Sequence, residues 1–270
     1  MNVLEIKTTE GVKESQFPEK WVEASESQFV CACKALVNET YFRSADFIKE
    51  FLALSDTDFQ TLTPFARYAI REQCGFIFEE QDYRFKTSKV PQMAIAGTTY
   101  WGILDNFSNI TWEEFLYADQ FLIQQEYENL CAVIYRPEKK HWDGESDRRI
   151  PFTIFGMRNR LELFKQVNYE TLAAAVINYR AMRLACLEDK YHNIFSSKDE
   201  LEKNELEDDE QEEETPEQEK EEINRFSWVN IHRNLLGDNV HEEYKFLRLP
   251  VHTVLHRLNA LIEENRKYKK

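Results

Sequence analysis

Two histidines near the C-terminus have the spacing that best suits metal chemistry. His252 and His256 stand four residues apart in a segment with helical periodicity, so both imidazoles would lie on one face of a helix. A zinc-protease motif of the HExxH type needs a glutamate after the first histidine, and Thr253 occupies that position. The nearby groups that could complete a ligand set are His232, His241 and Glu242. The sequence therefore favours polar histidines on a helix face over a metal site, and no cofactor is expected.

A polar loop at residues 138–149 is the second place where chemistry is conceivable, because functional residues concentrate on loops. It holds His141, Asp147 and two arginines. No serine or cysteine nucleophile in a G-x-S-x-G context accompanies it, and phosphate-binding and dinucleotide-binding motifs are absent. The paired carboxylates Glu113 and Glu114 suit a helix start, where the dipole favours acidic side chains. We therefore expect a protein that is not an enzyme. A metal-dependent hydrolase using the His141 loop or the C-terminal histidines is the less favoured alternative.

The cysteines favour reduced thiols in a core over a disulfide framework. Their number is odd, and most stand in apolar, helical contexts. Cys31 and Cys33 form a C-x-C pair, but residues two apart on a helix point to different faces, which makes a poor chelate. The five are Cys31, Cys33, Cys74, Cys131 and Cys186.

Aromatic side chains are the strongest candidates for a binding role, because they dominate interface anchors as well as cores. The sequence leaves both readings open for the group around residues 100–127, with core packing favoured. The residues that we single out as possible partner contacts are Trp101, Trp112, Tyr117, Tyr127, Trp228 and Leu255.

The candidate residues Trp112, Tyr117 and Tyr127 belong to the stretch 111–137, TWEEFLYADQFLIQQEYENLCAVIYRP, whose pattern predicts the helices that position them. Thr111 is expected to cap a helix, with Glu114 completing a capping box. A second apolar run, residues 130–135, ends before Pro137, which cannot donate a backbone hydrogen bond and disfavours helical geometry at Arg136. Two helices separated by a short break are therefore expected here.

Composition predicts a mainly α fold. The 270 residues are 42% hydrophobic and 13% aromatic, enough for a substantial core, whereas glycine and proline number only 7 each. The net charge of −15 is concentrated, because residues 199–222 hold 15 acidic and 2 basic side chains and leave about −2 for the rest. That distribution gives no strong field for nucleic acid.

Residues 1–196 are expected to form a helical bundle domain. It would begin with an irregular lead-in containing one short strand at residues 2–7. Predicted helices follow near 25–38, 46–54 and 65–78, the last capped by Thr63 with Pro64 at its first position. A small β-hairpin or irregular platform is expected between 83 and 107. A further helix near 158–166 and one long helix over 169–195 complete the domain.

The rest of the chain divides into two parts. Residues 197–223 are expected to be an acidic disordered linker, because they cannot bury enough apolar surface to offset ordering. Residues 224–270 are expected to form a small C-terminal helical unit that packs on something else, because it is too small to be stable alone. With no signal-peptide pattern at the N-terminus and no apolar run near the roughly 20 residues that span a bilayer, the sequence favours a soluble intracellular protein without a membrane partner.

The order of these segments resembles a group of helical proteins encoded among the tail genes of tailed bacteriophages, similar to tail assembly chaperones. The residues that carry the resemblance are TWEEFLYAD at 111–119 and LCAVIYRP at 130–137, then FSWVNIHRNLLGD and LRLPVHTVL near the C-terminus. It covers residues 100–195 and 224–262, and the N-terminal region only by its layout. Residues 105–109 depart from the pattern.

The resemblance implies a non-enzymatic chaperone in the cytoplasm of a bacterial host cell. Such a protein binds the hydrophobic tape measure protein and brings tail tube subunits to it during virion morphogenesis. Its two-part layout would give each partner its own unit, with the acidic linker as a soluble tether. The alternative within the same setting is a virion structural protein, such as a connector, tail or baseplate component. The sequence leaves a homo-oligomer open.

Overall fold

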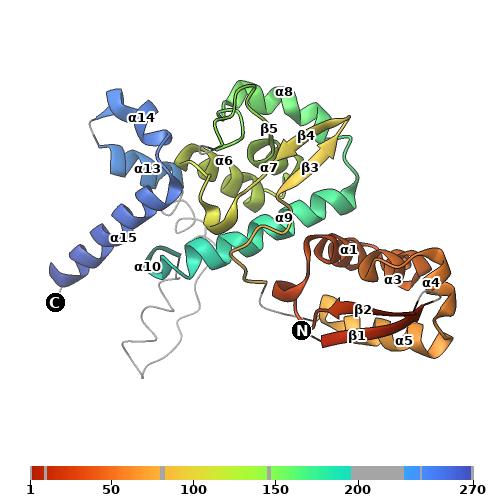
Figure 1. Cartoon of the computed structure of the whole chain (residues 1–270). Helices are drawn as coiled ribbons and strands as arrows, with labels where there is room; N and C mark the ends of the chain where they lie inside the picture. Colours follow the sequence, from red (N-terminus) through yellow and green to blue (C-terminus); the bar gives the residue numbers. More distant parts are fainter. Residues whose placement is uncertain are drawn as a thin grey trace.

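Helices dominate the structure, which is a computed structural model describing residues 2–8, 11–79, 83–144, 147–195, 228–237 and 239–268. Two small antiparallel sheets accompany them, and the prediction of a mainly α fold is confirmed. The N-terminal helices lie at one side, a second group of helices lies in the middle, and the C-terminal helices lie at the other side (Figure 1). The predicted acidic linker at 197–223 lies outside the described residues.

The chain begins with a β-hairpin rather than an irregular lead-in. Strands β1 (Asn2–Thr8) and β2 (Gly11–Phe17) pair along their whole lengths, so the prediction of a single short strand was wrong. The second strand is mostly polar and has no strong pattern of its own. It is held by packing, because Phe17 is 2% exposed and its ring lies 5.8 Å from that of Phe51.

The N-terminal helices are short because a new capping residue follows each one. Asn38, Ser44, Ser55 and Thr63 each accept a hydrogen bond from the backbone N–H three residues further on. Ser25 and Gln28 form a full capping box at the first of these helices. After the single turn η1 (Trp21–Glu23), the series is α1 (Glu26–Val37), α2 (Glu39–Arg43), α3 (Ala45–Leu52), α4 (Asp56–Thr61), α5 (Pro64–Gln73) and the 3-10 turn η2 (Cys74–Ile77).

The middle of the molecule is built around α7 (Tyr127–Ile134), which contacts α6, α8 and α9. Residues 130–134 of α7 and the following residue, Tyr135, are all 0% exposed. The apolar run seen in the sequence is therefore the centre of the core. The surrounding elements are η3 (Asp105–Phe107), α6 (Trp112–Ile123), α8 (Ile154–Phe164) and α9 (Tyr169–Arg183). Helix α9 also packs along α1 and so joins the N-terminal helices to this group (Figure 1).

A three-stranded sheet covers one side of this group. The expected hairpin is present as β3 (Gln92–Ile95) and β4 (Thr98–Trp101), and the two-residue strand β5 (Arg136–Pro137) adds to its edge. The third strand was not predicted, because two residues carry no pattern. It forms because Pro137 ends the helical path of α7 and leaves Arg136 extended beside Trp101.

The long helix predicted over 169–195 is interrupted. Helix α9 passes into a π-helical turn, η4 (Leu184–Glu188), and after three turn residues the short α10 (His192–Phe195) follows. An apolar pattern alone does not reveal a change of hydrogen-bond register inside a helix, so the π turn could not be predicted from the sequence.

The C-terminal helices pack on the start of α6. They are α13 (Trp228–Leu236), the 3-10 turn η5 (Val240–Glu242), α14 (Glu243–Leu247) and α15 (Val251–Tyr268). Two backbone hydrogen bonds fix the junction, from Trp112 N to Leu249 O at 2.8 Å and from Val251 N to Ile110 O at 2.9 Å. None of the helices in the described ranges is long and apolar enough to span a bilayer.

Gly102 marks the closest approach in the core, where the end of β4 meets the ring of Tyr135. A Cβ at Gly102 would lie 2.6 Å from Cε1 of Tyr135. That ring is fully buried and held by its hydroxyl, which donates to Val90 O at 2.8 Å. We expect Gly102→Ala to lower the free energy of unfolding in urea by about 1–3 kcal/mol. Gly75→Ala is the control, because its Cβ would meet only Glu79 Oε1 at 4.0 Å. Equal unfolding midpoints for the two variants would contradict the prediction.

Candidate partner-binding surface

A buried cluster of four charged side chains lies beneath the polar loop at 138–149. Glu114 Oε1 lies 2.7 Å from Arg136 Nη2 and 3.1 Å from Arg149 Nη2. Asp147 Oδ2 lies 3.2 and 3.0 Å from the same two nitrogen atoms. Glu114, Arg136 and Arg149 are each 1% exposed. Two carboxylates thus face two guanidinium groups, and the charge of the cluster balances.

Local structure explains why these residues meet. The capping box at the start of α6 points Glu114 back toward the helix entry, where Thr111 N and Oγ1 donate to Glu114 Oε2 at 3.0 and 2.9 Å. Arg149 donates to Ile134 O at 2.8 Å and also to Asn109 O. The end of the polar loop is therefore fastened to the beginning of α6 and to the end of α7.

Burial and pairing shift the pKa values of this cluster in a consistent way. Desolvation lowers the pKa of Arg136 to about 10, although the charge of Glu114 opposes the shift. Burial pushes the pKa of Asp147 upward, but its hydrogen bonds with Arg149 and the charges of Arg149 and Arg136 hold it below its ordinary value. Both groups stay charged at neutral pH. The charged side chains of the cluster therefore position the loop.

The loop fixed in this way presents a stacked trio of side chains at the surface. The guanidinium carbon of Arg148 lies 3.9 Å from the ring centroid of Trp101 and 4.2 Å from that of Trp142. Arg148 Nε also donates to Glu138 Oε1 at 2.7 Å. Trp101 was predicted as a partner contact and is partly exposed here, whereas Trp142, 36% exposed, was not selected. Its position in a polar loop beside two arginines was the available signal.

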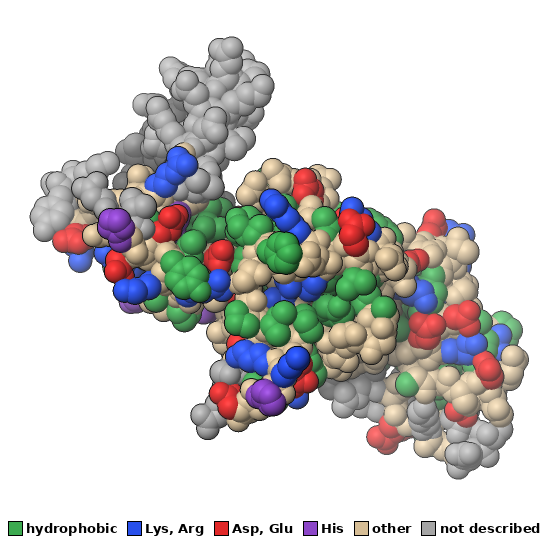
Figure 2. All heavy atoms as spheres, turned by 90° about the horizontal axis from the view of Figure 1, so that it is seen from above, with side chains coloured by type: hydrophobic (Ala, Val, Ile, Leu, Met, Phe, Trp, Pro, Cys, Tyr) green, Lys and Arg blue, Asp and Glu red, His purple; other side chains and the backbone are tan. Residues whose placement is uncertain are grey.

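An apolar surface lies over α6 and the beginning of α8. The ring of Tyr117 lies 6.3 Å from that of Phe121 and 5.7 Å from that of Phe152, and all but Phe152 remain partly exposed. Ile154 and Phe155 follow after the capping residue Thr153 and are 37% and 75% exposed. Seen from above, hydrophobic side chains gather across the middle of the molecule with basic side chains between them (Figure 2). We call these five residues the α6–α8 surface: Tyr117, Phe121, Phe152, Ile154 and Phe155.

Two of the predicted partner contacts have buried side chains in this structure. Trp112 and Leu255 are both 0% exposed. Trp112 stacks on Phe115 and donates from Nε1 to His232 Nδ1 at 3.1 Å. Both the apolar face and the N–H group of its ring therefore make contacts within the protein. Leu255 lies in the apolar stripe of α15 that faces the body.

The other predicted contacts are distributed over separate places. Tyr117 belongs to the α6–α8 surface, and Tyr127 is partly exposed at the start of α7. Trp228 is partly buried, because its ring packs on Trp112 and Phe115 at 5.7 and 5.0 Å. Trp228 Nε1 also donates to Asp119 Oδ2. Trp228 therefore serves mainly to attach the C-terminal helices.

The histidines considered for metal binding do not gather in the described part of the chain. His252 is half-buried and bonded to Asn106 O, while His256 and His141 are exposed. Within the described ranges, no three His, Cys, Asp or Glu side chains are grouped as a metal site would need. All five cysteines are buried free thiols.

Comparisons with known proteins add no assignment to this geometry. No family model, no curated protein and no solved structure matches the chain.

Proposed function

We propose that this protein is a non-enzymatic assembly chaperone of a bacteriophage tail, which binds the tape measure protein and tail tube subunits during morphogenesis. The identity of these partners comes from the sequence resemblance. The observation that carries a binding role is the exposure of Ile154 and Phe155, 37% and 75%, two and three residues after Phe152, whose ring lies 5.7 Å from that of Tyr117. Exposed apolar side chains near partly exposed aromatic rings favour protein contact.

The chemistry of the surface suits an apolar helical segment of a partner. Phe155 and Ile154 stand out from the first turn of α8, and Tyr117 and Phe121 provide ring faces and edges on α6. Aromatic residues that are already ordered lose little entropy on binding and are frequent anchors of interfaces. A tape measure protein, long and hydrophobic, would offer such segments.

Phe155→Asp tests this proposal. The variant places a charge at the centre of the α6–α8 surface, so recovery of the tape measure protein in a pull-down from infected cells should fall by at least about tenfold. Partner amounts would be quantified by mass spectrometry. Stability should change little, because the side chain is 75% exposed.

Phe65→Asp is the matched control for that experiment. Phe65 is 79% exposed on α5, away from α8, and the substitution adds the same charge. Equal recovery with both variants, or no tape measure protein with the unaltered chain, would contradict the proposal. Mass spectrometry of purified virions distinguishes a chaperone from a virion structural protein. If this protein is abundant in the virions, it is a structural protein and the chaperone proposal is contradicted.

A further inference from the structure

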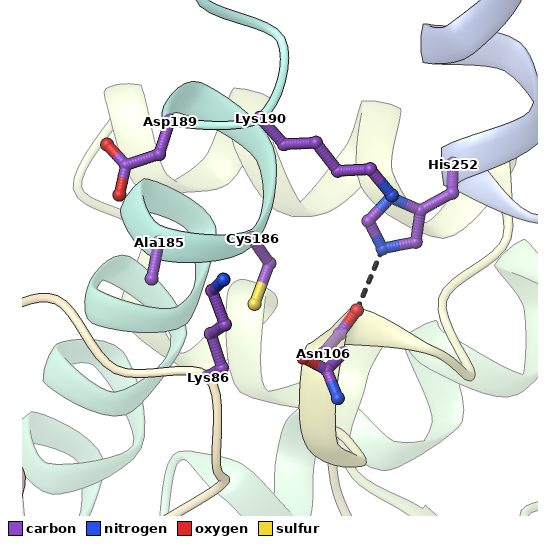
Figure 3. Close-up of a pocket in the computed structure, with 7 residues that line it drawn as sticks. All are labelled: Lys86, Asn106, Ala185, Cys186, Asp189, Lys190 and His252. Carbon is purple, nitrogen blue, oxygen red and sulfur yellow. Dashed lines mark hydrogen bonds between the residues drawn. The ribbon is translucent and has the colours of Figure 1, made fainter.

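A hollow of about 440 Å³ lies where three distant parts of the chain meet, apart from the α6–α8 surface. Lys86 comes from the segment before β3, Cys186 and Lys190 from η4 and the turn after it, and His252 from α15 (Figure 3). Its volume falls within the range of about 300–1,000 Å³ that is usual for small-molecule sites. The remaining wall is formed by Ala185, Asn106 and Asp189.

Two departures from regular backbone geometry occur at this hollow. The π turn η4 carries Ala185 and Cys186, and π turns inside helices are frequent at functional sites. On the facing wall, Asn106 and Phe107 have φ angles of 56° and 59°, in the left-handed region that non-glycine residues rarely adopt. Both departures shape the same cavity, which supports a binding role for it.

His252 forms part of the wall of the hollow, and neither of its ring nitrogens is available to bind a ligand. Its Nε2 lies 2.8 Å from the carbonyl oxygen of Asn106, which can only accept, so Nε2 carries the proton and donates. Its Nδ1 lies 3.1 Å from the hydroxyl of Tyr191. Both ring nitrogens are thus engaged, and the dashed bond in Figure 3 shows how α15 is tied to the turn at Asn106.

Two lysines, Lys86 and Lys190, line the hollow, and the carboxylates that act on Cys186 beside them are Asp105 and Asp189. Asp105 Oδ1 accepts a hydrogen bond from the backbone N–H of Ser88 at 2.9 Å. Asp189 Oδ1 lies 2.8 Å from Arg84 Nη1, so its negative charge is balanced from outside the cavity. No carboxylate in the described ranges pairs with Lys86 or Lys190. Two ammonium groups therefore face one cavity in a chain whose net charge is −15, and an anion would neutralise them. The sulfur of Cys186 points into the space near Lys86 and adds a weak donor (Figure 3).

We propose that this hollow binds the phosphate group of a small organic anion. Lys86 and Lys190 approach from separate segments, so a dianion between them makes charge-assisted hydrogen bonds to both. The space beyond a single phosphate, along Ala185 and the aliphatic stems of the lysines, receives the organic part. The ligand would lie at the junction of α15 with the rest of the molecule.

Isothermal titration at constant ionic strength tests the site with phenyl phosphate, inorganic phosphate and phenol as probes. Phenyl phosphate should bind, inorganic phosphate should bind more weakly, and phenol should not bind. Lys86→Gln combined with Lys190→Gln should weaken phenyl phosphate binding by at least about tenfold. Amide chemical shifts of Cys186 and Asn106 in the unaltered protein should move on titration, which locates the ligand without any substitution.

The charge-matched control combines Lys165→Gln with Lys245→Gln. Both lysines are exposed on other helices and each pairs with a glutamate three residues earlier. This variant should keep phenyl phosphate affinity within about twofold of the unaltered chain, because long-range effects of surface charge are screened by salt. Equal weakening in both double variants, or shifts spread over the surface lysines, would overturn the site. Equal affinity for inorganic phosphate and phenyl phosphate would overturn the organic ligand.

Discussion

Glu114→Gln is expected to lower the free energy of unfolding by about 3–5 kcal/mol, the range found when one member of a buried ion pair is removed. Gln keeps the size of the side chain and can still accept from Thr111, so the helix cap survives in large part. It removes the charge that faces Arg136 and Arg149, each 1% exposed. Asp147 would then face two buried guanidinium groups alone. Urea unfolding at neutral pH measures the loss as a lower midpoint with an unchanged slope.

The neighbouring residue supplies the control for this result. Glu113 lies one position earlier in α6, and its contact with Arg248 is long, at 3.7 Å. Glu113→Gln removes the same charge and should cost no more than about 1 kcal/mol. If the two variants unfold at the same urea concentration, the buried cluster does not stabilise the loop that carries Trp142 and Arg148.

The helices themselves were largely predictable, because the signals for them are local. Thr111 with Glu114, Asn168 and Thr63 with Pro64 are capping patterns that depend on a few neighbouring residues, and each begins a helix in the structure. Pro137 ends α7 for an equally local reason. The two helices expected in 111–137, with a short break between them, are present as α6 and α7, because their apolar residues recur with helical periodicity.

Long-range pairing was not predictable from the same residues. Glu114 was correctly assigned to a helix start, yet nothing in its surroundings indicates that Arg136 and Arg149 come to the same carboxylate from 22 and 35 positions further along the chain. The burial of Trp112 has the same origin, because its partner His232 lies 120 residues away. The candidate surface was therefore predicted only in part, through Trp101 and Tyr117. The exposure of Trp142 depends on where the loop at 138–149 is held, and that of Phe155 depends on where α8 packs, so neither could be predicted from the sequence.

The hollow between η4 and α15 shows why small-molecule sites without a motif escape sequence analysis. Lys86, Lys190 and His252 belong to three segments with no common pattern, and the π turn that directs Cys186 inward has no sequence signature. His252 attracted attention for its spacing from His256, but α15 turns the two toward different surroundings. Spacing on one helix could not reveal that His252 bonds to a backbone carbonyl 146 residues away.

Trp228→Ala is expected to detach the C-terminal helices from α6. The indole of Trp228 packs on Trp112, Phe115 and Phe195 and is the donor to Asp119. Losing a large ring from such a site costs about 3–5 kcal/mol. The substitution also removes the Trp228 hydrogen bond to Asp119, which is 1% exposed and keeps its ion pair with Arg183. Hydrogen exchange followed by mass spectrometry should show faster exchange in α13 and α15 and unchanged exchange in α1.

One further variant separates the ring from its hydrogen bond, and a second serves as a control. Trp228→Phe keeps an aromatic ring against Phe115 but loses the N–H donor, so it should cost about 1–3 kcal/mol, the penalty for an unsatisfied buried acceptor. Trp142→Ala removes an indole that is 36% exposed in the polar loop and should leave exchange in α13 unaltered. Slow exchange of α13 in Trp228→Ala would mean that other contacts, such as Trp112 to His232, suffice to hold the unit. Faster exchange confined to residues 228–268 would instead identify Trp228 as the main anchor of a C-terminal unit that can separate from the helical body.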